Sequence, residues 1–184
     1  LLLTGTATTS QNVVLIDTPS SNDPARLQVD TDDAQTLTGI ISEEGGSYGL
    51  DKTGDGTLTL TGENTFSGPV TVSGGTLSMA TDANLGTNTG ATALTLAAGV
   101  SLVLTGTDAI SKPITLDDGA ATLENTEDKT LSGAIVGNGG LTKTGADILT
   151  LSGSNSYSGG TTVSAGTLSG DTDSLQGTIT NDAA

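Results

Sequence analysis

Residues 50–77 read LDKTGDGTLTLTGENTFSGPVTVSGGTL, and residues 141–168 repeat this pattern as LTKTGADILTLSGSNSYSGGTTVSAGTL. The two segments align without a gap, 91 positions apart. The matched pairs include Lys52 with Lys143, Leu58 with Leu149, Asn64 with Asn155, Phe66 with Tyr157, and Gly68 with Gly159. An internal repeat of this length predicts an array of similar structural units.

The similarity extends beyond these two segments. Residues 29–39 (VDTDDAQTLTG) resemble residues 123–133 (LENTEDKTLSG), and the opening LLLTGT resembles LVLTGT at 102–107. We therefore expect one β-helix fragment over residues 1–184, with a first module at about 1–100 and a second at about 101–184. Because the sequence starts at Leu1 and matches the repeat at once, we expect it to be part of a larger protein.

Short strings that alternate apolar residues with Thr or Ser recur along the chain, which is typical of strands with one buried face. They lie at 57–60, 70–72, 75–78, 93–96, 101–104, 114–116, 121–123, 129–131, 148–151, 161–163 and 166–169. Gly, Asn and Asp separate them, as tight corners require. No segment has a helical stripe, and TDANLG at 81–86 predicts one turn at most.

Leucines recur at a spacing of one solenoid coil. Leu58, Leu77, Leu96 and Leu116 are separated by 19, 19 and 20 positions, and Leu131, Leu149 and Leu168 by 18 and 19. This spacing predicts a parallel β-solenoid in which Leu stacks on Leu, around a dry interior of Leu, Val and Ile. A disordered tract would lack the alternation, and a β-sandwich would not usually give a 91-residue self-copy.

Composition excludes several functional classes. The chain has no Cys and no His, which removes thiol nucleophiles, imidazole bases and the common zinc sites. Its net charge of −16 disfavours nucleic acid and anionic lipid as partners. No apolar run approaches the roughly 18 residues of a membrane helix. We expect no enzyme activity, no cofactor and no insertion into a membrane.

Acidic residues form the nearest approach to a catalytic pattern. The clusters are Asp30–Asp32–Asp33, Asp51–Asp55, Asp117–Asp118, Glu124–Glu127–Asp128 and Asp171–Asp173. Paired acids can cleave polysaccharide, but the chain has almost none of the Arg, Lys and aromatic residues that bind sugar. We interpret the clusters as solvated loops. The segment GGSYGLD at 45–51 has one residue too many for a calcium repeat and no tandem copy. No catalytic, cofactor-binding or metal residue is predicted.

Two further patterns admit a binding role. Phe66 and Tyr157 share one repeat position, where we expect each to cap the apolar interior rather than form an exposed platform. Pairs such as Thr57–Thr59 and Thr142–Thr144 would form an ice-binding array only if Thr stacked on successive coils. The irregular coil lengths predict that the Thr positions are scattered.

The two long segments resemble the autotransporter-associated β-strand repeat, also called the passenger-associated transport repeat. The shared features are Leu-x-Lys-x-Gly, Leu-Thr-Leu-(Thr/Ser)-Gly, Asn-x-(Tyr/Phe)-Ser-Gly and Val-x-x-Gly-x-Leu. TDANLG at 81–86 resembles the usual continuation, and TDSLQG at 172–177 departs from it slightly. The resemblance implies a right-handed parallel β-helix in the passenger of a type V secreted protein, where the repeat aids export and surface folding.

The resemblance also implies a function. We expect a structural and adhesive stalk segment, extracellular and at the bacterial cell surface, in a parent protein that is anchored in the outer membrane or secreted. Its expected partners are like rods, or a host-surface or glycan ligand. The alternatives are a passive export or spacer module without its own binding, and a polysaccharide-acting β-helix enzyme.

Overall fold

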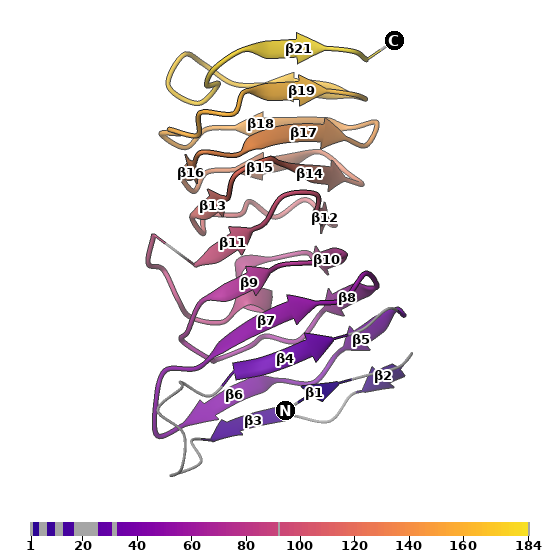
Figure 1. Ribbon diagram of the computed structural model, residues 1–184, viewed down its shortest axis with the longest axis vertical. Coiled ribbons are helices and arrows are strands. Elements are labelled where there is room, and N and C mark those ends of the chain that lie inside the picture. Colours follow the sequence, from indigo (N-terminus) through magenta and orange to yellow (C-terminus); the bar gives the residue numbers. More distant parts are fainter. Residues whose placement is uncertain are drawn as a thin grey trace.

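A computed structural model describes residues 2–3, 7–9, 13–16, 26–30, 33–91 and 93–183. These residues form a parallel β-solenoid, because every strand pairs in parallel with strands of the neighbouring coils. Figure 1 shows the coils stacked along the long axis, from β1–β3 near the N-terminus to β21 near the C-terminus. The predicted all-β solenoid is confirmed.

Each coil passes through up to three strand positions, which we call faces A, B and C. Face A is a seven-stranded sheet of β1 (Leu2–Leu3), β4 (Arg26–Asp30), β7 (Gly49–Thr53), β9 (Val70–Val72), β11 (Leu94–Leu96), β13 (Ile114–Leu116) and β16 (Ile135–Gly137). Face B is a nine-stranded sheet of β2 (Ala7–Thr9), β5 (Gln35–Leu37), β8 (Thr57–Leu60), β10 (Thr76–Met79), β12 (Ser101–Leu104), β14 (Ala120–Asn125), β17 (Gly140–Thr144), β19 (Thr161–Val163) and β21 (Ile179–Asn181).

Face C holds the third strand of a coil and consists of two smaller sheets. One pairs β3 (Val13–Ile16) with β6 (Ile41–Glu44), and the other pairs β15 (Lys129–Leu131), β18 (Ile148–Leu151) and β20 (Thr167–Ser169). Between them the chain crosses this face in loops and in the 3-10 helix η1 (Asp82–Leu85), which confirms the single turn expected at 81–86. Within the described residues, η1 is the only helix.

Alternation places the apolar residues inside the coils. In β8, Leu58 and Leu60 are buried while Thr57 and Thr59 remain partly exposed. The predicted strands therefore coincide with the observed ones, with small shifts at their ends. Burying apolar area at about 25 cal/mol per Å² in every coil is the main force that holds such a stack together.

The expected single Leu column is wrong. Leu58 pairs with Leu77 on face B, but the next partner of Leu77 is Leu102. Leu96 lies on face A, between Val72 and Leu116. The reason is that the coil after Leu77 carries η1 and its loop, which adds residues on face C without changing the strand register on face B.

The same correction applies near the C-terminal end. On face C, Leu149 pairs with Lys129 and Leu168, whereas Leu131 pairs with Leu151. The leucine spacing therefore gives the average length of a coil correctly, but it does not identify which residues stack.

The two repeat copies begin on different faces. Copy 1 (residues 50–79) starts with β7 on face A, and copy 2 (residues 141–169) starts with β17 on face B. From Leu50 to Ile135 the chain completes four coils on face A, and copy 2 begins one face later. The 91 residues from the start of copy 1 to the start of copy 2 thus span four complete coils and the step from face A to face B. Copy 2 is therefore rotated around the rod relative to copy 1. The module boundary expected near residue 100 stays a prediction.

Candidate functional site

The repeat places a lysine inside the solenoid at one equivalent position in each copy. Lys52 and Lys143 are both fully buried. The Lys52 ammonium donates to the carbonyl oxygens of Thr53 (2.7 Å), Gly54 (2.7 Å) and Gly74 (3.3 Å). The first two belong to its own corner and the third to the corner of the next coil, so the ammonium ties neighbouring coils together.

Copy 2 repeats this contact on another face. The Lys143 ammonium donates to the carbonyl oxygens of Thr144 (2.6 Å), Gly145 (2.8 Å) and Ala165 (3.3 Å). Burial lowers the pKa of Lys143, although the nearby carboxylates of Asp147 and Glu124 oppose this change. A buried ammonium is tolerated when its donors are satisfied, and here backbone carbonyls satisfy them.

An asparagine forms the second equivalent tie. The Asn64 amide accepts from the N–H of Ile41 (2.8 Å) in the coil before and donates to the carbonyl of Asn84 (2.6 Å) in the coil after. Asn155 accepts from the N–H of Ile135 (2.7 Å) and donates to the carbonyl of Ser174 (2.6 Å). Each Asn therefore connects three successive coils at a crossing where the chain forms no strand.

Glycine is required where coils approach closely. Gly75 and Gly166 occupy one repeat position with φ of 62° and 71°. A Cβ at Gly75 would lie 2.3 Å from the Gly56 oxygen, and one at Gly166 would lie 2.4 Å from the Gly145 oxygen. Both the left-handed backbone and the space exclude other residues.

The aromatic residues belong to the interior. Phe66 and Tyr157 are 0% and 1% exposed. The hydroxyl of Tyr157 also lies 2.6 Å from that of Thr161. The expectation that they complete the apolar interior is confirmed, and neither offers a binding platform.

The remaining two lysines are buried as well. Lys129 donates to the carbonyls of Ala80 (2.6 Å), Thr105 (2.9 Å) and Gly106 (3.2 Å), and Lys112 donates to Asn88 (2.5 Å). Burial lowers the pKa of both, against the attraction of nearby carboxylates that include Asp82.

The expected dry interior of Leu, Val and Ile is therefore wrong. All four lysines of the chain are buried, and asparagine side chains accompany them. The sequence did contain a signal: alternation in Leu50-Asp51-Lys52 places Lys52 on the same side as the buried Leu50. As a consequence, none of the lysines contributes an exposed positive charge to the outer surface.

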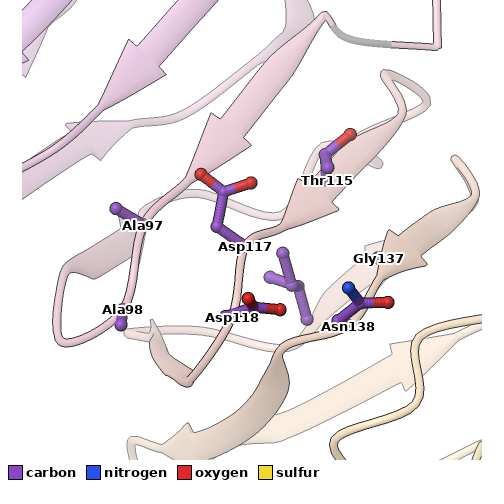
Figure 2. Close-up of a pocket in the computed structure, with 8 residues that line it drawn as sticks. Ala97, Ala98, Thr115, Asp117, Asp118, Gly137 and Asn138 are labelled. Carbon is purple, nitrogen blue, oxygen red and sulfur yellow. The ribbon is translucent and has the colours of Figure 1, made fainter.

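One acidic pair lines a hollow on the corner between faces A and B (Figure 2). The hollow is open, has a volume of about 580 Å³ and is lined by Ala97, Ala98, Thr115, Leu116, Asp117, Asp118, Gly137 and Asn138. In Figure 2 the two carboxylates stand between the alanines on one side and Asn138 on the other. The lining includes no cationic and no aromatic side chain, so it offers hydrogen bonding without a group to stack on sugar or hold an anion.

The interpretation of the other acidic clusters as loops is only partly right, because Asp30, Asp51 and Glu124 belong to β4, β7 and β14. Glu124, Glu127, Asp128, Asp171 and Asp173 are exposed. Asp51 is partly exposed in β7, and Asp55 is exposed in the turn after this strand. Asp32 lies outside the described residues, as does the side chain of Asp30, so the Asp30–Asp32–Asp33 cluster is not described as a whole.

In the part of the chain that the structure describes, no three acidic side chains lie close enough together to hold a metal ion. At 45–51 the side chain of Tyr48 is buried, and its N–H donates to the Glu43 carboxylate (2.8 Å). The prediction that the chain has no metal, cofactor or catalytic residue stays a prediction. Among the described residues, no helix has the length and apolar character needed to cross a membrane.

The expected scattering of Thr is wrong for face B. One outward position of this face carries a hydroxyl on seven successive coils. The register joins Thr57, Thr76, Ser101, Thr122, Thr142, Thr162 and Thr180. We call this set of seven residues the hydroxyl column. The extra residues of the longer coils lie at corners and on the other faces, so the register on face B continues without a shift.

Comparison with known proteins agrees with this geometry. Residues 50–79 and 141–169 match the family model described as Passenger-associated-transport-repeat. The chain therefore carries two copies of this repeat. It is also 38% identical, over 174 residues, to the "Adhesin BmaC autotransporter" of Brucella suis biovar 1 (strain 1330). That match covers 88% of this chain and 5% of the adhesin.

These two matches confirm the resemblance seen in the sequence, and they imply a surface-exposed location, in a protein anchored in the outer membrane or secreted. The repeats and the solenoid fit an adhesive or structural passenger segment. No solved structure matches the chain significantly.

Proposed function

We propose that this chain is a non-enzymatic stalk segment of an autotransporter passenger, which supports export, presents adhesive parts of the parent protein and associates with like rods. The observation that carries the proposal is the set of inter-coil ties, since Lys52 and Lys143, and Asn64 and Asn155, join neighbouring coils in the same way. A segment that adds coils to a growing stack needs contacts of this kind.

Coil stacking also provides a driving force for export. Each coil that folds outside the cell buries apolar area and satisfies the buried polar groups of the coil before it. Such a coil cannot easily slide back through a narrow pore, because it would have to unfold first. The stack therefore biases movement outward without a separate energy source.

The export role is tested in the parent passenger, expressed with its translocator in a Gram-negative host. Asn155→Ala removes a tie, and Ser156→Ala changes an exposed neighbour in the same loop. We expect surface display, measured by protease accessibility on whole cells, to fall at least several-fold for Asn155→Ala alone. Equal display of both variants would contradict a role of the ties in export.

The non-enzymatic role rests on the chemistry of the acidic pairs. Asp117 and Asp118 line an open hollow without a positive or aromatic partner, and the lysines are buried. We expect no turnover when the protein is incubated with a panel of acidic and neutral polysaccharides. Product formation that is abolished by Asp117→Asn with Asp118→Asn would contradict the proposal and establish a polysaccharide-acting enzyme.

Association with like rods is tested by sedimentation velocity over a wide concentration range, with and without calcium. Reversible dimers or larger species would support a self-associating segment. A single elongated monomer at every concentration would instead support the passive spacer, with the adhesive site elsewhere in the parent protein.

A further inference from the structure

The corner between β16 and β17 contains the only Asn-Gly pair of the sequence. Asn138 precedes Gly139 there, and none of the other eight asparagines precedes a glycine. Glycine lacks a Cβ, so its backbone nitrogen is less shielded than that of any other residue. Asn138 is exposed, and water reaches its side-chain amide. We propose that Asn138 is a deamidation site whose reaction is held back by the stacking of coils, a property that does not depend on the proposed function.

Asparagine is one of the chemically labile residues of proteins, and the reaction here needs only water. The backbone nitrogen of Gly139 gives up its proton and attacks the side-chain carbonyl carbon of Asn138. The new N–C bond closes a succinimide ring, while the bond to the side-chain nitrogen breaks and ammonia leaves. Water then opens the ring at either carbonyl. One opening yields an aspartyl residue, and the other yields an isoaspartyl residue, whose main chain is longer by one carbon atom.

The fold holds the Gly139 peptide in place from both sides. Its N–H donates to the carbonyl of Leu116 in the coil before (3.1 Å), and its carbonyl accepts from the N–H of Gly159 in the coil after (3.1 Å). Gly139 is buried, and a Cβ at this position would overlap the carbonyl oxygen of Asp117. Ring closure has to turn this peptide plane toward the Asn138 side chain, which breaks both hydrogen bonds. The reaction therefore needs the corner to open first.

Charge in the hollow of Figure 2 opposes the reaction as well. Asp117 and Asp118 line this hollow together with Asn138, and the lining includes no cationic side chain. Negative charge that develops on the Gly139 nitrogen is disfavoured beside two carboxylates. The aspartyl product adds a third carboxylate to the same hollow, and the isoaspartyl product lengthens the main chain where Gly139 has no spare room. Both products should therefore weaken the stacking of β16 and β17 on the coil before.

The first test follows deamidation of the wild-type protein by peptide mass spectrometry, in mildly alkaline buffer with and without enough urea to unfold the chain. In urea we expect Asn138 to react at least about ten-fold faster than any other asparagine, because the nitrogen of Gly139 is unshielded. In the folded protein we expect its rate to fall at least about ten-fold, because only the open fraction reacts. Equal rates with and without urea would show that the coils do not protect Asn138. Faster reaction of another asparagine in urea would show that the site is wrong.

The second test opens the corner without denaturant. Asn155→Ala removes the acceptor of the Ile135 N–H at the start of β16. Asn64→Ala removes the equivalent contact of copy 1, earlier in the stack, and is the matched control. Circular dichroism verifies that both variants fold. We expect several-fold faster deamidation of Asn138 for Asn155→Ala alone, and equal rates in the two variants would overturn the claim that local opening controls the reaction.

The third test measures the effect of the product on the fold. Asn138→Asp reproduces the aspartyl product, and Asn138→Ser is the polar control without charge. Thermal unfolding at neutral pH should show a lower midpoint for Asn138→Asp, and the difference should shrink in acid as the carboxylates become protonated. Equal midpoints at both pH values would contradict the repulsion in the hollow. None of these results bears on export or association of the stalk, so a failure here leaves the proposed function as it stands.

Discussion

Copy 1 and copy 2 make the same inter-coil contacts on different faces of the rod. The lysine and asparagine ties have matching partners and similar distances, yet copy 1 begins on face A and copy 2 on face B. The repeat therefore encodes how a coil contacts the coils before and after it. Its orientation around the rod is set by the number of residues in the intervening coils.

The segments directly after the two copies differ in their hydrogen bonding. After copy 1, the Asn84 side chain accepts from Ala80 and Thr81 and donates to Gly62, and the Asp82 carboxylate accepts from Ser111 in a later coil. After copy 2, Ser174 takes the place of Asn84 and bonds mainly within its own loop. The strands β20 and β21 are also largely exposed. Copy 1 should therefore be the more stable of the two.

The largest expected difference concerns the close approach of coils. Gly75→Ala places a side chain on a left-handed backbone conformation, which costs about 1–2 kcal/mol, and it adds a clash with the Gly56 oxygen. We expect the free energy of unfolding to fall by about 3 kcal/mol in total. Gly166→Ala should cost less global stability, because the C-terminal coils can open locally. Urea unfolding measures both. Gly99→Ala is the control, since Gly99 has φ of 78° and nothing within 4 Å, and it should show the strain alone.

The asparagine ties give the next effect. Asn64→Ala leaves the Ile41 N–H and the Asn84 carbonyl without this partner, which should cost about 2–4 kcal/mol. Asn155→Ala should cost about 1–2 kcal/mol in global unfolding, again because its surroundings can open locally. The exposed Ser156→Ala serves as the control. Equal losses for the two asparagine variants would contradict the difference between the copies.

The buried lysines should make stability rise in alkaline solution. Because the pKa of Lys143 is lowered on folding, the folded state releases its proton first as pH increases. Stability should therefore rise with pH from the lowered pKa up to the unfolded value of 10.5. Urea unfolding between about pH 8 and 10 measures this slope, to which Lys112 and Lys129 also contribute. Lys143→Met should reduce it; an unchanged slope would show that Lys143 is not desolvated.

The smallest effect is expected in acid, and it concerns Glu43 in β6 and Asp171 in the loop after β20. For Glu43, burial raises the pKa, but hydrogen bonds from Ser67 and Tyr48 outweigh it and lower the pKa overall. Hydrogen bonds from Ser174 and Asp173 lower the pKa of Asp171. Both contributions are present above the unfolded pKa and are lost as pH falls through the lowered value. For Glu43→Gln we expect a change of at most about 1 kcal/mol in thermal unfolding at pH 6, and a smaller change as pH falls through the lowered pKa.

Local alternation explains why the strands could be predicted, since each needs only a few residues and one buried side. Stacking could not be predicted in the same way. Leu96 comes after Leu77 at the right spacing but lies on face A, because the η1 loop lengthens one coil. The rotation of copy 2 has the same origin, since it depends on the summed length of four coils.

The burial of the lysines was not predicted, although the sequence contains a signal for it. Lysine is usually exposed, yet Lys52 comes two residues after Leu50, at the inward spacing of a strand. The hydroxyl column was missed for a related reason, because its members are separated by unequal numbers of residues. In both cases the pairing register, which the sequence alone does not give, decides the position.

Amide hydrogen exchange in the two asparagine variants tests the central claim that the copies share contacts but not faces. In the structure, the N–H of Ile135 donates to the side chain of Asn155, which lies 20 positions later in the chain. The N–H of Ile41 donates to the side chain of Asn64, which lies 23 positions later. Asn155→Ala should therefore release protection at Ile135, and Asn64→Ala at Ile41. Ile41 belongs to β6 on face C, whereas Ile135 belongs to β16 on face A. If Asn155→Ala left Ile135 protected and instead released an N–H on face C, the account would be wrong.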